Sequence, residues 1–216
     1  MAVRDIDLVK VWEKGVLIKK NIDFLRIPTK PVIFPLSEQI DDIIQDLLDT
    51  YSALPCAGIA ANQLGFDKKI FIGMKYVKEK DVIDDPSKNI DEVESDPDNY
   101  EIYINPQIDK VDKKSTQKGD EGCLSIPNLS LELERYDEIK VRYYNTKGRR
   151  IKKPLSGFLS RLFQHELDHL NGNLMLQHEN IFDAGMWAED DIHKKLFMQL
   201  MEYLNKWHKN ELLLTN

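Results

Sequence analysis

Two histidines four residues apart, with a glutamate directly after the first, form the segment with the clearest chemical potential. His165, Glu166 and His169 lie in the run QHELDH and match the pattern HExxH. On a helix, residues i and i+4 emerge one turn apart on the same face, so both imidazole rings can bind one ion. Glu166 is offset around the helix, where a general base for a water molecule belongs. The spacing therefore predicts a metal site for hydrolysis.

The third protein ligand decides which class of hydrolase this is, because catalytic zinc usually takes three protein ligands and a water. The metzincin pattern HExxHxxGxxH requires a histidine three residues after Gly172, where Met175 stands instead. A thermolysin-like peptidase uses a later glutamate, and the position of Glu189 satisfies that spacing. Glu189 also begins an acidic run at the expected start of the last helix, where the helix dipole favours acids. The peptidase hypothesis stays open on spacing alone.

Cysteine content offers a second source for the missing ligand. The chain has two cysteines in 216 residues, Cys56 and Cys123, which excludes a disulfide scaffold and favours a reducing compartment. Cys123 follows Gly122 in the run EGCLS, and its thiolate could bind a metal. An isolated cysteine is more often a small buried apolar residue. Cys123 is therefore a candidate ligand that its sequence position alone does not establish.

Charge and hydropathy exclude several other function classes. The 37 acidic residues exceed the 30 basic ones and give a formal net charge of -7, so no direct nucleic-acid site is expected. Charges recur every few residues in the first 15 positions, which predicts neither a secretory signal nor a transit peptide. No apolar run approaches the length of a membrane span. We expect a cytoplasmic protein without a membrane partner, or an organellar one if a transit peptide is missing from this chain.

Three helices are predicted. The first follows Ser37 as a candidate N-cap and repeats apolar residues at helical spacing, namely Ile40, Ile43, Ile44, Leu47, Leu48 and Tyr51. The second carries the HExxH pattern from about Gly157 to Asn171 and ends at Gly172. The third, at about 190–209, places on one side Ile192, Leu196, Leu200, Leu204 and Trp207.

Strands are predicted at Ile70–Ile72, at Tyr100–Asn105 and twice within Leu131–Tyr144, with a hairpin-like turn at 145–149. The stretch at about 77–99 is crowded with charged residues, Pro and Asn and is expected to be a surface insertion. We predict one catalytic domain over residues 1–216. Its fold class is α+β, with antiparallel sheets packed around the central HExxH helix and a C-terminal helix.

Three separated blocks occur in the order found in one enzyme family. They are GIAANQ at 58–63, EGCLS at 121–125 and QHELDH at 164–169. Together they resemble the peptide deformylases, and the likeness extends from the first helix to about Leu176. The first block matches the family pattern GxGxAAxQ from its second glycine, and Cys56 stands where the first glycine is expected. The substitution could change the catalytic rate and the peptide selectivity. It also leaves open the hypothesis that the protein is a non-catalytic relative that keeps the fold and the metal.

The resemblance implies a role for each matched residue. Cys123, His165 and His169 would bind the metal, and Glu166 would accept the proton of water and pass it to the leaving amine. The side-chain amide of Gln63 and the backbone N–H of Leu124 would donate to the formyl oxygen as it becomes an oxyanion. Glu121 would meet Arg135 in an ion pair that orients the loop of the ligand Cys123.

The resemblance also implies the substrate, which is the formyl-methionine end of newly made polypeptides. Phe158 and Leu162 precede His165 by seven and three residues on the face toward the metal, so they could line an apolar pocket, or simply pack in the core. Gly58 is expected among the substrate-binding residues. The implied ion is Fe²⁺ in the cell, with Zn²⁺, Ni²⁺ or Co²⁺ in purified protein; mixed imidazole and thiolate ligands by themselves suit zinc.

The ribosome is a second candidate partner. The last helix carries four lysines that could contact it, namely Lys194, Lys195, Lys206 and Lys209. Similar terminal helices in the family contact the ribosome, which would imply a transient contact here. A solvated amphipathic face is the alternative that we favour.

Overall fold

The computed structural model describes residues 7–77, 98–177 and 186–214, and for 207–214 the backbone alone. Two antiparallel sheets and a small hairpin account for the strands. The hairpin pairs β1 (Trp12–Glu13) with β2 (Val16–Leu17). The five-stranded sheet has the order β3 (Gly58–Ala60), β4 (Ile70–Met74), β5 (Tyr100–Val111), β8 (Glu138–Tyr144) and β9 (Arg150–Ser156). The three-stranded sheet has the order β10 (Met186–Ala188), β7 (Ile126–Tyr136) and β6 (Thr116–Cys123).

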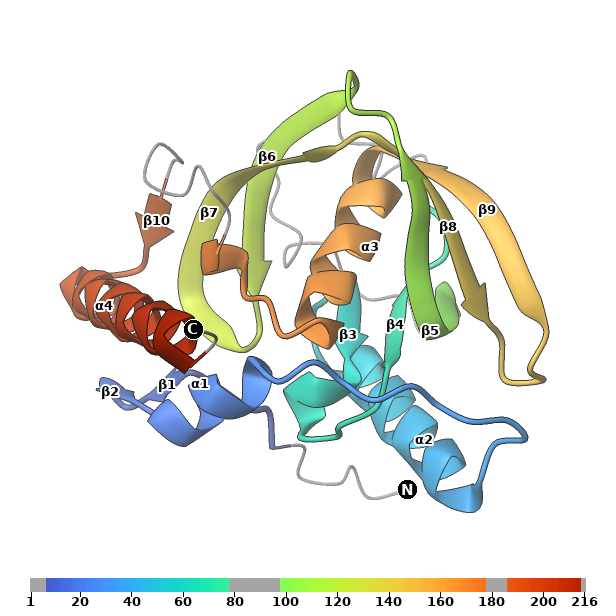
Figure 1. The fold of residues 1–216 in the computed structure, drawn as a ribbon, viewed down its shortest axis with the longest axis horizontal. Helices are drawn as coiled ribbons and strands as arrows, with labels where there is room; N and C mark the ends of the chain where they lie inside the picture. The colour runs from blue at the N-terminus through green and yellow to red at the C-terminus, as the bar shows by residue number, and fades with distance from the viewer. Residues whose placement is uncertain (1–6, 78–97, 178–185, 215–216) are drawn as a thin grey trace.

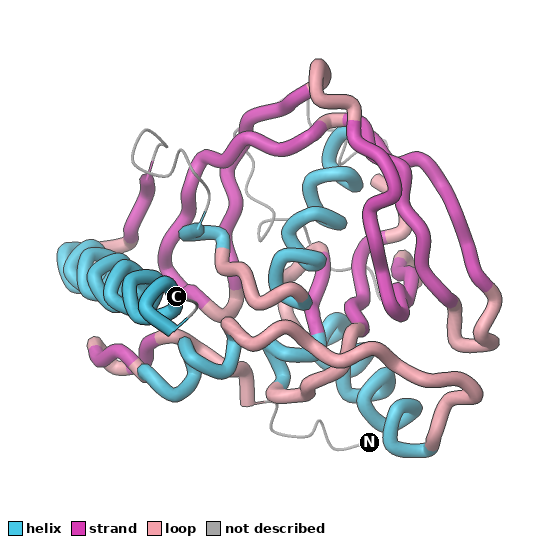
Figure 2. The backbone as a smooth tube through the Cα atoms, in the orientation of Figure 1, coloured by secondary structure: helices cyan, strands magenta, loops and turns pink. Residues whose placement is uncertain are grey.

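Helix α3 (Gly157–Leu170) lies at the centre, with the three-stranded sheet on one side and the five-stranded sheet on the other (Figure 1). The strands curve around this helix in the tube view (Figure 2). One residue, Asp137, separates β7 from β8, so the chain passes from one sheet directly into the other. This connection fixes both sheets against the two sides of α3.

The face of the five-stranded sheet toward α3 is aromatic. The rings of Phe71 and Tyr103 stack with centroids 4.3 Å apart, and the Phe163 ring of α3 meets both edge-on. Because side chains alternate along a strand, Ile70 and Ile72 point to the opposite face. There they pack against α2 (Glu38–Ala53) in a second buried cluster. The sheet is therefore covered on both faces at β3 and β4, whereas β8 and β9 keep an exposed outer face.

Helix α2 confirms the predicted apolar stripe, with five of its six members buried and Leu48 partly buried. Ser37 occupies the N-cap position with extended backbone angles, but its side chain makes no capping hydrogen bond. The first turn carries Glu38 and Asp41 instead, which favour the helix N-terminus through the dipole.

The outer face of the three-stranded sheet is covered by α4 (Asp191–Leu214) and α1 (Lys19–Leu25). Leu196, Leu200 and Leu204 are buried in this cluster, as predicted for the last helix. Ile192 continues the same spacing one turn earlier but is 57% exposed and lies beside Gly15 of the β1–β2 hairpin. The side chain of Trp207 lies outside the described residues.

The predicted fold class is confirmed, and the strands at β4, β5, β7 and β8 lie where the sequence predicts them. Asn145 closes the turn between β8 and β9 by accepting hydrogen bonds from the N–H groups of Lys147 and Arg149. Two short 3₁₀ segments, η1 (Ala61–Leu64) and η4 (Met175–Gln177), complete the described elements. The predicted insertion at 77–99 falls almost wholly outside the described residues. Within the described part, no helix has the length and apolar character that crossing a membrane requires.

Candidate metal centre

Strand β6 and helix α3 bring three candidate ligands together. One donor atom each from Cys123, His165 and His169 lies within 4.8 Å of the others. All three side chains are buried, and Cys123 Sγ is 3.2 Å from His169 Nε2. Cys123 ends β6 beside a register irregularity and pairs with Ile126, which turns its sulfur toward the helix. The predicted cluster is therefore present as a group.

The second nitrogen of His165 is held by a buried acid. Glu121 Oε2 lies 2.9 Å from His165 Nδ1, and Arg135 donates two hydrogen bonds of 2.8 Å to the same carboxylate. Arg135 also pairs with Asp168 of α3. Because Nδ1 is engaged, Nε2 of His165 is left as the ligand atom. A thiol and two imidazoles with this support are a donor set that fits a divalent transition metal.

The electrostatics of the cluster favour a cation among these ligands. Burial opposes ionisation of Glu121, yet Arg135 and His165 outweigh it and hold the pKa of that carboxyl well below its ordinary value. Burial also opposes a charge on His165, but hydrogen bonds with Cys123 and Glu121 raise its pKa well above 6.5. Burial and the neighbouring His165 lower the pKa of His169 to about 3. His169 is therefore neutral, as a ligand must be.

Glu166 is 2% exposed and faces strand β3. A Cβ placed on Gly58 would lie 2.7 Å from Glu166 Oε1 and 2.9 Å from Leu162 Cδ1. A glycine at position 58 is thus required for the carboxylate to lie where it does. The structure therefore places Gly58 against Glu166, and the substrate contact expected for this glycine stays a prediction.

Gln63 extends from η1 toward the same cluster. Its side-chain Nε2 donates to Ser125 Oγ at 3.3 Å and to Cys123 Sγ at 3.7 Å, while its Oε1 accepts from the N–H of Ala60. These bonds fix which end of the amide faces the sulfur. Leu124 follows Cys123 in the turn to β7. The two predicted oxyanion donors thus flank one ligand.

Leu162, Phe158 and Cys56 have the burial of residues that pack in the core. Leu162 is 2% exposed and packs with Ala57 and Met74, and Phe158 is partly buried against this group. Cys56 is 1% exposed and belongs to the cluster under α2. Its side chain therefore turns into the core.

The glutamate of the peptidase hypothesis lies elsewhere. Glu189 is exposed between β10 and α4, and its backbone N–H donates to Asn128 O. It is absent from the metal cluster found among the described residues, in which Cys123 is the third member. The structure thus favours the cysteine over the glutamate.

Two supporting residues escaped the sequence analysis. Asn62 Nδ2 donates to the backbone oxygen of His169 at 2.6 Å, which ties the first motif to the third. Asp168 completes the ion pair with Arg135. Both could have been identified from the sequence, because Asn62 lies in the motif GIAANQ and Asp168 lies in the motif QHELDH.

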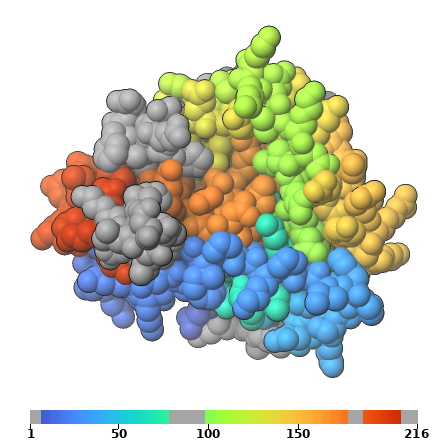
Figure 3. Space-filling model, viewed as in Figure 1, coloured from blue at the N-terminus to red at the C-terminus, as the bar shows by residue number. Residues whose placement is uncertain are grey.

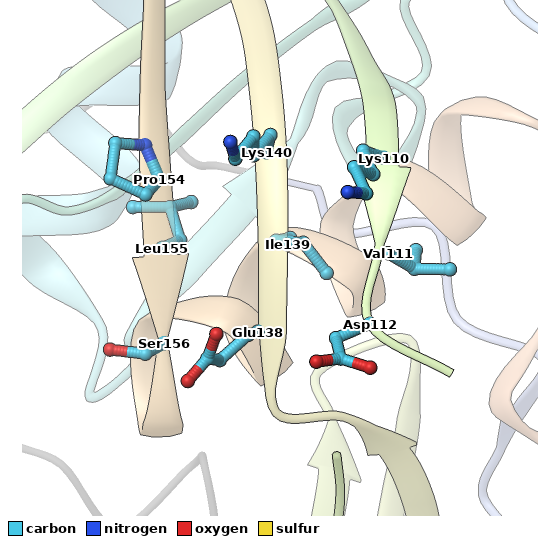
Figure 4. A pocket seen from close by; sticks show the side chains of 9 residues that line it. All are labelled: Lys110, Val111, Asp112, Glu138, Ile139, Lys140, Pro154, Leu155 and Ser156. Carbon is cyan, nitrogen blue, oxygen red and sulfur yellow. The ribbon is translucent and has the colours of Figure 1, made fainter. Parts of the chain in front are cut away.

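A hollow of ≈ 400 Å³ lies away from this cluster, at the ends of β5, β8 and β9. Figure 4 shows Lys110 and Lys140 at one end of it and Asp112 and Glu138 at the other. None of its lining residues belongs to the metal cluster or its supporting network. We assign it no role in the chemistry.

The chain matches known proteins over most of its length. Residues 16–183 match the family described as polypeptide deformylase. The peptide deformylase of Elusimicrobium minutum is 37% identical over 163 residues, which cover 75% of this chain and 85% of that protein. That of Aquifex aeolicus is 35% identical over 159 residues, or 74% and 83% of the two chains.

Solved structures agree with these matches. The crystal structure of peptide deformylase from Thermotoga maritima is similar with a TM-score of 0.58 and 32% identity, covering 72% of this chain and 90% of that one. A Met-Ala-Ser-bound class I type b peptide deformylase from Acinetobacter baumannii has a TM-score of 0.61 and 25% identity, covering 80% and 98%. Sequence, fold and the Cys-His-His cluster lead to one conclusion. The chain belongs to the polypeptide deformylase family.

Proposed function

We propose that Cys123, His165 and His169 hold one divalent ion and that Glu166 moves the proton in deformylation. The reaction of the family removes the formyl group from the formyl-methionine end of new polypeptides and releases formate. The observation that carries the assignment of residues is the buried group of three donors beside a buried glutamate. A hydrolytic site needs both features.

A bound divalent ion would polarise the formyl oxygen and lower the pKa of water. The Glu166 carboxylate accepts the proton of the attacking water and delivers it to the amine as the C–N bond breaks, so that formate and a free N-terminus result. Burial of Glu166 excludes bulk water from this transfer.

Gln63 and Leu124 are proposed to stabilise the oxyanion. The hydrogen bond from the N–H of Ala60 orients the amide of Gln63, so its Nε2 points toward Cys123 and the reacting carbonyl. The N–H of Leu124 is adjacent to the same ligand in the chain. Each such donor is worth about 3 kcal/mol in comparable sites.

For the substrate side chain, we propose a pocket beside Leu162 and Phe158. The Acinetobacter baumannii relative, which was solved with Met-Ala-Ser, supports an unbranched first residue. Gly58 adjoins Leu162 and, because it has no side chain, takes up none of the space in this pocket. For the cell, we propose Fe²⁺ as the ion and the cytoplasm as the compartment, where nascent chains carry the formyl group.

For the lysines of α4, the alternative of a solvated face is better supported than ribosome contact by the pairs that they form on the helix. Lys194 and Lys206 already pair with Asp191 and Glu202 on the same helix, which reduces the charge available to a partner. Replacing Lys194 and Lys195 with Glu tests the contact by ribosome co-sedimentation. Unchanged co-sedimentation would reject it.

Formate release from a formyl-Met-Ala-Ser peptide tests the function, and Cys123→Ala separates it from the peptidase alternative. With Cys123 as a ligand, the variant loses metal and formate release together. Retained metal and cleavage of internal peptide bonds would instead favour Glu189 as the third ligand. Metal-replete wild-type protein without formate release would favour a non-catalytic relative.

A further inference from the structure

An arginine is buried in the helix that carries the metal ligands. Arg161 precedes His165 by one helical turn and is 6% exposed. Its guanidinium lies over Gly119 of β6, where a Cβ would be 2.3 Å from Nη1 and 2.6 Å from Cζ. The cation thus fills the volume that a side chain at position 119 would take. Any side chain at position 119 would force the guanidinium to shift.

The guanidinium of Arg161 has few partners for a buried charge. Its Nη2 donates to Gln117 Oε1 at 3.4 Å, and across the described ranges it forms no ion pair. The nearby carboxylate of Glu121 is already bound by Arg135 and His165. The other guanidinium nitrogens are not among the buried, unpartnered side-chain atoms of the described residues, so they keep some exposure and can donate to a bound acceptor.

The position of Arg161 points to the substrate as that acceptor. Gln117, Gly119 and Glu121 alternate along β6 and share the face that meets α3. On the helix, Leu162 faces Gly58 on one side, whereas Arg161 faces β6 on the other. The guanidinium therefore stands across the proposed first-residue pocket from Gly58, one turn away from the metal ligands.

We propose that Arg161 is a specificity-determining residue that donates to an oxygen acceptor on the first side chain of the substrate. The fitting substrates are formyl peptides whose first side chain is unbranched up to its δ atom and carries an oxygen on that atom, as in methionine sulfoxide or glutamine. Apolar norleucine fills the same volume without an acceptor. This inference rests on the proposed function and adds a substrate class to it.

The test compares kcat/KM for three formyl tripeptides that differ only in the first residue: norleucine, glutamine and methionine sulfoxide. In Arg161→Leu, the ratio of the glutamine or sulfoxide peptide to the norleucine peptide falls about tenfold or more, as for a lost hydrogen bond to a charged donor. Gly119→Ala displaces the guanidinium without removing its charge, so it lowers the same ratio. Arg142→Leu, on strand β8, is the matched control and leaves the ratio at the wild-type value.

Binding of the deformylated tripeptides, measured by calorimetry, gives a readout that does not depend on turnover. The proposal expects Arg161→Leu to weaken the glutamine and sulfoxide products more than the norleucine product. Equal changes for all three peptides in both assays would overturn it and leave Arg161 a packing residue. If wild-type protein releases no formate from any peptide while still binding the products, the proposed function fails rather than this inference.

Discussion

Glu121 Oε2 lies 2.9 Å from Nδ1 of the candidate ligand His165, and the side chain of Glu121 has no exposed surface. The bond fixes the tautomer and the ring orientation of His165, so Nε2 faces Cys123 and His169. Arg135 holds the same carboxylate from the other side through two hydrogen bonds of 2.8 Å. The network joins β6, β7 and α3 behind the ligands.

Glu121→Gln is expected to weaken metal binding about 10- to 100-fold, because a neutral amide orients and polarises His165 less than a carboxylate does. Competition with a chelator of known affinity measures the change. Glu134→Gln, on the exposed side of β7, is the matched control. Equal affinities in the two variants would show that the contact with His165 is unimportant for the ion.

Arg135→Ala is expected to lower the free energy of unfolding by about 3–5 kcal/mol, because the buried carboxylate of Glu121 loses its cation and keeps only the contact with His165. Urea denaturation measures this. Arg142→Ala breaks the partly exposed pair with Asp109 and should cost about 1 kcal/mol or less. A loss at Arg135 no larger than the loss at Arg142 would contradict the buried network.

The metal-free protein is expected to lose stability as the pH falls from 6.5 toward 3. The pKa of His169 is lowered to about 3 in the folded state, while the ordinary value is 6.5. The unfolded chain therefore takes up this proton first, and folding loses free energy through that window.

His165 acts in the opposite sense, since its raised pKa stabilises the fold below 6.5 and loses that effect at higher pH. His169→Gln isolates the first contribution when unfolding is followed at pH 7 and pH 4. A difference between these pH values as large as in wild type would show that His169 is not the group involved.

Gly58→Ala is expected to lower kcat/KM for the formyl peptide about 100-fold, since the added methyl displaces Glu166 Oε1. Gly73→Ala is the control, because its Cβ meets side-chain atoms at 3.3 Å and 3.4 Å and can be accommodated. Activity and thermal unfolding are measured for both. Full activity in Gly58→Ala would mean that Glu166 does not need its observed position.

Strong periodicity and complete motifs made much of this structure predictable. Helix α2 buries one apolar face and helix α3 buries the face that carries the candidate ligands. The buried residues therefore recur every three or four positions in both sequences. Strands β6 and β9 were not predicted, because TQKGDEGC and RIKKPLS are mostly polar. β9 is an edge strand, and β6 uses its inner face for Gln117, Glu121 and Cys123 in place of apolar packing.

Other features of the site depend on tertiary proximity. The 44-residue separation of Glu121 and His165 carries no local pattern, so their contact was not predicted, and the family resemblance implied only the pair of Glu121 with Arg135. Neither Arg161 nor Gly119 belongs to a recognisable sequence pattern. Only the structure shows that the guanidinium lies over the glycine. Ile192 continues the apolar spacing of α4 but is 57% exposed, which its spacing does not reveal.

The central claim is that Glu166 carries the proton at a site whose ion is held by other residues. Glu166→Gln keeps the size of the side chain and leaves Cys123, His165 and His169 in place. We predict metal content equal to wild type and formate release from formyl-Met-Ala-Ser reduced about 10²- to 10⁴-fold. Formate release at the wild-type rate by the metal-replete variant would contradict the account.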